Sequence, residues 1–253
     1  MIDFPSLGFE PSRITENSQR IKARFEPDPT PKPQEAAIIA YGSSLIDSWP
    51  EMRSCPVTFT CSGAHKFLQE RHFKPTYHVD TDPRAHKAVM LGMPRDGVIY
   101  LAASIVHPDY LDKLERHDVR LFHLLFQDDE AYDATPSNEW MVTGGTVAGP
   151  RTIKLARALG YTKLHLFGFD ASGKHAGPHG NAPPDRKYRT VNLHGRQFQT
   201  TENLFLQASG FFNEMNTLPP PLELTFHGDG LLQEMAKGWT YQHKPGYPML
   251  VMK

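Results

Sequence analysis

Short apolar runs alternate with amphipathic stretches through the middle of the chain. Runs rich in β-branched and aromatic residues predict strands at 36–41, 57–61, 76–79, 98–102 and 119–125. Helices are expected between them, at 43–50, 63–71, 83–91 and 108–116. Strands and helices that alternate every ~20–25 residues are typical of βαβ units, so we expect an α/β fold with a mostly parallel sheet.

A second unit of the same kind starts at a glycine-rich turn. Thr143-Gly144-Gly145-Thr146 leads into a helix that ends at Gly160, and the apolar run 163–167 predicts the next strand. The pattern after this unit predicts the two strands of a hairpin, a helix and a last strand, at 188–193, 196–200, 201–215 and 222–226. The tail from Trp239 is broken by prolines, so we expect it to pack on the outside.

Local composition divides the chain into an arm and one domain. Residues 1–35 are polar and proline-rich and predict an N-terminal arm, whereas 36–253 predict a single domain. Within that domain, 127–141 is acidic, aromatic and irregular, and it is interpreted either as a lid or as a solvated surface loop. Residues 171–184 are rich in glycine, histidine and proline and predict an active-site loop.

Charge and cysteine content argue against several classes of protein, such as nucleic-acid-binding, membrane-bound and disulfide-rich proteins. The formal net charge of −1 gives no support for binding nucleic acid or a membrane surface through bulk electrostatics. Cys55 and Cys61 are too few for a disulfide framework or a thiolate zinc site. The longest apolar runs fall short of the ~18 residues of a membrane span, and the N-terminus lacks a signal-peptide pattern. We therefore expect a soluble, cytoplasmic protein.

Small and acidic residues follow the first and third predicted strands. Gly42, Ser43 and Ser44 can offer backbone N–H and hydroxyl donors to a phosphate at the start of a helix. Asp80 and Asp82 lie two residues apart, so in an extended segment both carboxylates face one side and can hold Mg²⁺ together with substrate phosphates. The alternative interpretations are a plain strand-to-helix turn capped by Ser44, and a turn in which Asp82 caps the next helix.

Similar chemistry surrounds the second unit. Gly144, Gly145 and Thr146 at a helix start predict a second anion-binding turn, although close packing of helix on strand explains them nearly as well. Asp170 ends the strand at 163–167, where it is predicted to bind metal, to orient an acceptor or to cap the next turn.

Histidines and basic residues supply further candidates. His175 and His179 lie in the glycine- and proline-rich loop, where one of them is a candidate general base or phosphate contact. Positive charge for a leaving diphosphate is available from Lys174, Arg186, Lys187 and Arg189, unless these form a solvated basic face. His227 and Asp229 end the last strand and are weaker site candidates.

Two ordered blocks of these motifs resemble the MptE-like 6-hydroxymethylpterin diphosphokinase family, which is related to flagellin-modifying and sialyltransferase-like glycosyltransferases. Gly42-Ser43-Ser44-Leu45 resembles the family's G-P-S-L turn, with Ser43 in the place of proline. Ser62-Gly63-Ala64 takes the place of a polar turn that often contains asparagine, and Asp80-Thr81-Asp82 that of the family's D-x-D-like strand end. The block from Gly144 to Asp170 resembles the G-G-S-V and L-x-G-x-D segment.

The resemblance covers roughly residues 36–92 and 142–180, under half of the chain. It implies a Rossmann-like fold with helices on both faces of the sheet, and a nucleotide-activated donor bound in part by Ser62 and Gly63. The first hypothesis is Mg²⁺-dependent transfer of a diphosphate from ATP to a hydroxymethylpterin-like alcohol. The second is glycosyl transfer from a nucleotide-activated sugar such as a CMP-sialic-acid-like donor, and the third is a non-catalytic nucleotide-binding module. The acceptor and the oligomeric state stay open.

Overall fold

The computed structural model describes residues 8–145, 147–173, 187–246 and 248–253. In chain order, the strands of the main sheet are β1 (Ala36–Ile39), β2 (Val57–Cys61), β3 (Tyr77–Asp80), β4 (Ile99–Ala103), β5 (Asp118–Leu124), β6 (Trp140–Val142), β7 (Lys163–Phe167), β10 (Glu223–Phe226) and β11 (Leu250–Met252). Their spatial order is β10-β7-β1-β2-β3-β4-β5-β6-β11, and all neighbours are parallel except β6 and β11. This confirms the predicted α/β, Rossmann-like fold.

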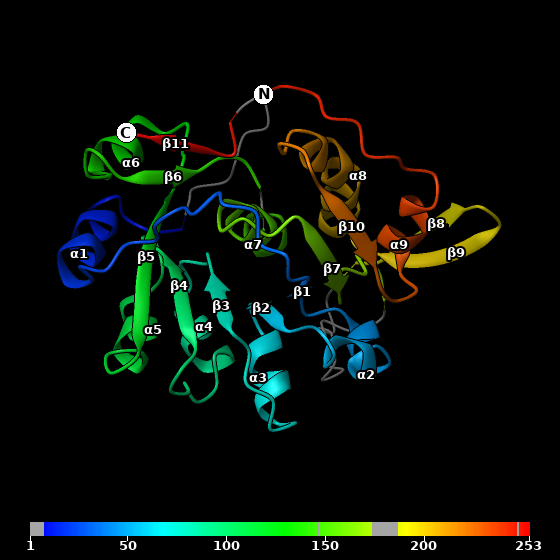
Figure 1. The fold of residues 1–253 in the computed structure, drawn as a ribbon, viewed down its shortest axis with the longest axis horizontal. Coiled ribbons are helices and arrows are strands. Elements are labelled where there is room, and N and C mark those ends of the chain that lie inside the picture. Colours follow the sequence, from blue (N-terminus) through cyan, green and yellow to red (C-terminus); the bar gives the residue numbers. More distant parts are fainter. Residues whose placement is uncertain (1–7, 146, 174–186, 247) are drawn as a thin grey trace.

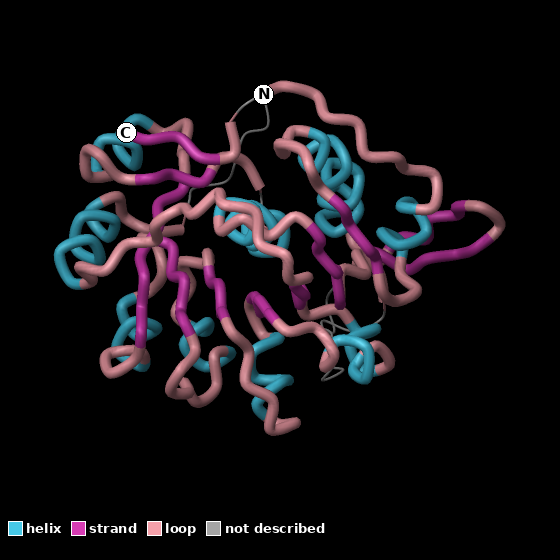
Figure 2. Tube along the Cα trace, in the orientation of Figure 1, coloured by secondary structure: helices cyan, strands magenta, loops and turns pink. Residues whose placement is uncertain are grey.

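Helices surround this sheet (Figures 1 and 2). The helical segments are α1 (Ser12–Arg20), the 3-10 turn η1 (Ser43–Ile46), α2 (Trp49–Met52), α3 (Ala64–Gln69), α4 (His86–Met90), α5 (Pro108–Lys113), α6 (Asp129–Ala134), α7 (Ala148–Ala158), α8 (Glu202–Asn216) and α9 (Leu231–Ala236). The predicted hairpin is present as β8 (Arg189–Leu193) and β9 (Arg196–Thr200), which extend away from the sheet beside α9 in Figure 1. Among the described residues, no helix has the length and apolarity required to cross a membrane.

The central strand β1 is buried on both faces, as expected for a parallel sheet covered by helices. Ala36 and Ile38 belong to a large apolar cluster that includes residues of α7, whereas Ala37 and Ile39 belong to a second cluster with residues of α2 and α3. Alternate side chains of a strand point to opposite faces, so this division shows helices packed on both sides of the sheet.

The predicted N-terminal arm contains a helix that the sequence analysis missed. Ile14 of α1 is fully buried, and the Asn17 amide donates to the carbonyl oxygens of Ser104 and Val106 at 2.8 and 2.9 Å. Phe25 is also buried, and its N–H donates to Leu121 O beyond the end of α1. Residues 12–25 therefore form part of the packed domain.

The segment 127–141 is more regular than either interpretation expected. It contains α6 and the first residues of β6, and Ala131 of α6 is fully buried. The Nζ of Lys253 donates to carbonyl oxygens near the end of α6, at Tyr132, Asp133 and Thr135. The segment is therefore built into the sheet edge together with residues 250–252, which form the edge strand β11 within the tail that was expected to pack on the outside.

Candidate functional site

The site follows from the order of four neighbouring strands. β7, β1, β2 and β3 are adjacent and parallel, so the turns that follow them meet at one edge of the sheet. The chain leaves β1 toward β2 and later returns to β7 on the other side of β1, which makes this a topological switch point. Ligands of open α/β sheets bind in the crevice at such a point.

Asp170, after β7, holds the turn that follows β1. Its Oδ2 accepts hydrogen bonds from the Ser44 N–H at 2.8 Å and from the Ser43 hydroxyl at 3.3 Å, and its Oδ1 accepts one from the Ser44 hydroxyl. Asp170 itself is only 4% exposed. The donors that were predicted to bind phosphate are thus largely used within the protein, and Asp170 caps η1 rather than the turn next to it.

Gly42 permits this approach because it has no side chain. A Cβ atom at this position would lie 2.5 Å from Gly168 O and 2.6 Å from Asp170 Oδ2, both shorter than real contacts. The Gly42 N–H also donates to Gly168 O at 2.9 Å. Gly42 therefore allows the turn after β1 to pack directly against the turn after β7.

A cavity of about 200 Å³ lies beside this turn. It is lined by Ser44, Asp47, Ser48, Glu51, Gly228 and Asp229. The volume is below the ~300–1,000 Å³ of a typical ligand pocket. The three acidic residues of the cavity disfavour a phosphate and suit a hydroxyl-bearing or cationic group.

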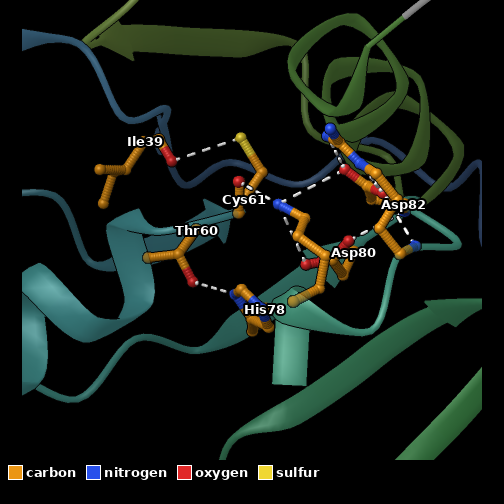
Figure 3. A network of polar contacts seen from close by, with 9 residues as sticks. Ile39, Thr60, Cys61, His78, Asp80 and Asp82 are labelled. Atoms are coloured by element: carbon orange, nitrogen blue, oxygen red, sulfur yellow. Dashed lines mark hydrogen bonds and ion pairs between the residues drawn. The ribbon is translucent and has the colours of Figure 1, made fainter. Parts of the chain in front are cut away.

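A cluster of charged residues lies at the ends of β2 and β3 (Figure 3). The Lys87 ammonium donates to the Ser62 hydroxyl and lies 3.8 Å from Asp80 Oδ2 and 3.9 Å from Asp82 Oδ2. Asp82 also binds the Arg84 guanidinium through both oxygens, at 2.9 and 2.6 Å. The two carboxylates therefore lie at similar distances from the same ammonium group.

The two aspartates differ in their electrostatic surroundings. Burial raises the pKa of Asp80, and the nearby Lys87 ammonium opposes this only in part. Partial burial also acts to raise the pKa of Asp82, but hydrogen bonds from Arg84 outweigh it and lower that pKa overall. Asp80 is thus the carboxyl group of this pair that takes up a proton more easily.

Ser62 adopts a backbone conformation that is uncommon for a residue with a side chain. Its φ of +54° lies in the left-handed region, which costs such residues of order 1–3 kcal/mol. Gly63 follows it in close contact, because a Cβ there would lie 2.9 Å from the ring of Tyr41. A strained residue held by Lys87 at a strand end is an observation that points to a functional site.

Lys87 and Arg84 were not among the residues predicted to form the site. Both follow the third strand within the predicted segment 83–91, where lysine and arginine are normally solvated. Lys87 is nevertheless only 6% exposed in its side chain, whereas Arg84 is 67% exposed. Their position shortly after a strand that ends in two aspartates could have indicated that they form ion pairs with those aspartates.

The glycine turn after β6 is occupied by a different ion pair. Gly144 and Gly145 have φ values of +56° and +75°, and a Cβ at Gly145 would lie 3.2 Å from Glu214 Oε1. The same Glu214 oxygen pairs with Lys154 at 2.6 Å. The predicted anion-binding turn therefore lies against one carboxylate and two basic side chains, those of Lys154 and Arg151, and anion binding there stays a prediction. Thr146 lies outside the described residues.

The start of α7 nevertheless lies over the switch point. A Cβ at Gly149 would be 2.7 Å from the ring of Phe169, which directly precedes Asp170. The connection after β6 thus brings the chain back across the sheet, so that α7 begins beside the end of β7.

The remaining candidates divide into three groups. His175, His179, Lys174 and Arg186 lie outside the described residues. On the exposed hairpin, Arg189 of β8 pairs with Glu202 at the start of α8, and Arg196 of β9 pairs with Asp229. His227 accepts or donates a hydrogen bond at 3.0 Å to His165, and its other ring nitrogen contacts Glu51 of the cavity at 2.7 Å.

A magnesium ion is implied by the resemblance, and oxygen ligands of the right chemistry are present at Asp80 and Asp82. In the observed arrangement, however, both carboxylates face the ammonium of Lys87. In the part of the chain that the structure describes, no three or more His, Cys, Asp or Glu side chains are grouped so as to hold a metal. The residues present do not fit a magnesium ion in this arrangement.

The chain is similar to known proteins at the level of solved structures and of a protein family. Among solved structures, the chain is similar to the MAf glycosyltransferase from Magnetospirillum magneticum AMB-1, with a TM-score of 0.65 and 14% identity over 92% of this chain. The chain spans 42% of the length of that protein, and the likeness shows a shared fold. A mammalian sialyltransferase in complex with Gal-beta-1-3GalNAc-ortho-nitrophenol gives a TM-score of 0.37 and 12% identity, over 90% of this chain and 81% of that chain. A search of curated proteins gave no match.

A family model described as 6-hydroxymethylpterin diphosphokinase MptE-like matches residues 12–175, from the start of α1 to just beyond Asp170. The match includes all the turns at the ends of β1, β2, β3 and β7, and it confirms the resemblance drawn from the sequence motifs. Since the match covers more than half of the chain, the protein belongs to the MptE-like family.

Proposed function

We propose that the protein is a nucleotide-dependent transferase whose donor binds at the edge formed by β1, β2 and β3. The observation that carries the proposal is the cluster of Ser62, Asp80, Asp82 and Lys87. It combines a strained serine, a carboxyl group with a raised pKa and a buried ammonium at the ends of two adjacent strands. Perturbed ionisable groups gathered at a strand edge are typical of functional sites.

Family membership favours diphosphoryl transfer from ATP to a 6-hydroxymethylpterin-like alcohol. In this reaction the alcohol oxygen forms a bond to the β-phosphorus, the bond from that phosphorus to the oxygen shared with the α-phosphate breaks, and AMP leaves. The proton of the alcohol must pass to a base. Asp80 is the described carboxyl group best suited to accept it, because burial raises its pKa. The exposed guanidinium of Arg84, beside Asp82, is available to stabilise negative charge that develops on the phosphate.

Glycosyl transfer from a nucleotide-activated sugar is the second candidate. The fold shared with the MAf glycosyltransferase over 92% of this chain favours it. The ammonium between Asp80 and Asp82 also favours it, since a diphosphate transfer would normally draw on carboxylates free to hold a metal.

A donor panel distinguishes the two reactions. The purified full chain is incubated with ATP and 6-hydroxymethylpterin, and separately with CMP- and UDP-sugars, each with and without Mg²⁺. Release of AMP, or of CMP or UDP, is followed by chromatography. Diphosphoryl transfer predicts AMP only, and glycosyl transfer predicts slow hydrolysis of one nucleotide sugar and no use of ATP.

Two variants connect the result to the site. Asp80→Asn keeps the shape of the side chain and is expected to reduce turnover at least about 100-fold, the range of a lost general base. Asp118→Asn, an exposed carboxylate at the start of β5, is the matched control and is expected to retain activity. Full activity of Asp80→Asn, or binding of nucleotide with no turnover of any donor, would reject a catalytic site at this cluster.

A further inference from the structure

The position of Lys87 between two carboxylates carries an inference about the cation that serves this site. An ammonium group has three donors, and in the described residues Lys87 makes one hydrogen bond, to the Ser62 hydroxyl. The carboxylate oxygens of Asp80 and Asp82 lie 3.8 and 3.9 Å away, so they attract the ammonium mainly through charge. This is the geometry of a cation placed between two anions.

The charges around this point already balance. Two carboxylates, Asp80 and Asp82, face two cations, Lys87 and Arg84, and Arg84 is bound to Asp82 through two hydrogen bonds. A divalent ion added between the carboxylates would leave an excess of two positive charges in a region where Asp80 and Lys87 are almost fully buried. Uncompensated charge is costly to bury, so Lys87 and a metal ion compete for the same position.

We propose that the Lys87 ammonium replaces a divalent cation between Asp80 and Asp82, so that this carboxylate pair binds no metal in the native protein. Lys87 is a positioning residue in this view. It keeps both carboxylates directed inward and fixes the Ser62 turn for the donor. This proposal rests on the proposed function only for the role of the donor. The absence of a metal ion between Asp80 and Asp82 can be tested without any substrate.

Binding of Mn²⁺, an oxygen-binding substitute for Mg²⁺, tests the proposal in the absence of nucleotide and acceptor. Free Mn²⁺ is measured by its electron paramagnetic resonance signal during titration with the full chain. Wild type and Asp80→Asn are expected to leave the Mn²⁺ signal equally unaffected. Lys87→Met, which keeps the length of the side chain and removes its charge, is expected to gain one Mn²⁺ site per chain, and this site is lost again in the Asp80→Asn/Lys87→Met double variant.

Lys113→Met, which removes an exposed lysine near the end of α5, is the matched control and should bind no more Mn²⁺ than wild type. A wild-type Mn²⁺ site that Asp80→Asn abolishes would overturn the proposal. So would a folded Lys87→Met variant that gains no site. Because loss of one member of a buried ion pair can unfold a protein, the comparison of wild type with Asp80→Asn decides the matter if Lys87→Met does not fold. None of these outcomes depends on turnover, so failure of the donor panel is a separate result.

Discussion

The carboxylate of Asp170 accepts a hydrogen bond from the backbone N–H of Ser44 at 2.8 Å, which joins the end of β7 to the turn after β1. The two residues are far apart in sequence and meet because β7 inserts beside β1. Gln233 adds a longer contact of 3.4 Å to Asp170 and donates to His227 O at 2.8 Å. Asp170 thus connects the turn after β1 to α9, and these contacts predict a structural role for its carboxylate.

Replacement of Asp170 by alanine is expected to lower the free energy of unfolding by about 3 kcal/mol, since it removes charged hydrogen bonds and leaves the Ser44 N–H without its acceptor. Urea unfolding followed by circular dichroism measures the loss. The control is Asp229→Ala, which removes an exposed carboxylate at the same cavity and should cost less than about 1 kcal/mol. Equal stability of the two variants would contradict the structural role of Asp170.

Gly42→Ala tests the close approach of the two loops. The added methyl group meets Gly168 O and Asp170 Oδ2, which can move only with their backbone and hydrogen bonds, so a loss of about 1–3 kcal/mol is expected. Gly210→Ala is a matched control, because it lies within α8 and a Cβ there has no neighbour within 4 Å. That control should stabilise the protein by about 0.5–1 kcal/mol, and the two changes in melting temperature should have opposite signs.

Stability is expected to fall in mild acid because of buried neutral histidines. Burial lowers the pKa of His65 from 6.5 to about 4, although its hydrogen bond with Leu91 O opposes the shift. Below pH 6.5 this histidine is therefore protonated in the unfolded chain but stays neutral in the folded chain. The free energy of unfolding decreases as the pH falls from about 6.5 to 4. The expected loss for this one residue is about 3 kcal/mol.

Urea midpoints measured between pH 7 and pH 4 test this slope. His65→Gln should show a shallower decline than wild type. Burial also lowers the pKa of His86, at the exposed start of α4, so His86→Gln should flatten the decline as well, but less than His65→Gln does. His123, whose pKa burial also lowers to about 4, accounts for part of the decline that remains. A wild-type midpoint that stays constant down to pH 4 would contradict the prediction.

The two thiols should differ in reactivity. Complete burial raises the pKa of Cys61 to about 12, so its thiolate is scarce at neutral pH and sterically inaccessible. Cys55 is half-buried and its pKa is raised less, by burial and by Glu35. A thiol reagent should therefore label one cysteine slowly in the native protein and the second only on unfolding. Labelling of native Cys55→Ser at the wild-type rate would show that Cys61 is exposed.

Regular patterns of apolar residues made most of the fold predictable. The strands β1, β2 and β7 match their predicted runs closely. β1 is continuously apolar, whereas apolar residues in β2 and β7 largely alternate with threonine, lysine or histidine, and both patterns are typical of strands. α1 was missed because its buried face includes Asn17 and Ser18, whose polar groups bind carbonyl oxygens instead of presenting an apolar stripe. β11 was missed because a short edge strand depends on its partner β6.

The location of the candidate site could be predicted from the sequence, but the contacts between its side chains could not. Gly42, Ser62, Asp80 and Asp170 all end neighbouring strands, so the topology alone brings them to one edge. The sequence could not show that the serine hydroxyls turn toward Asp170, or that Lys87 reaches between the two aspartates. Both depend on side chains from separate elements, and only the folded chain brings those together.

The segment matched by the family model ends at residue 175, but residues further along the chain also pack against the switch point. Gly230 packs so closely on Asp170 that a Cβ would lie 2.5 Å from its carbonyl oxygen, and the Leu232 N–H donates to that oxygen at 3.1 Å. Expression of residues 12–175 alone would open the carboxylate of Asp170 to solvent and remove one wall of the adjoining cavity. Anyone who trims this protein to its family boundaries should therefore retain α9 and the outermost parallel strand.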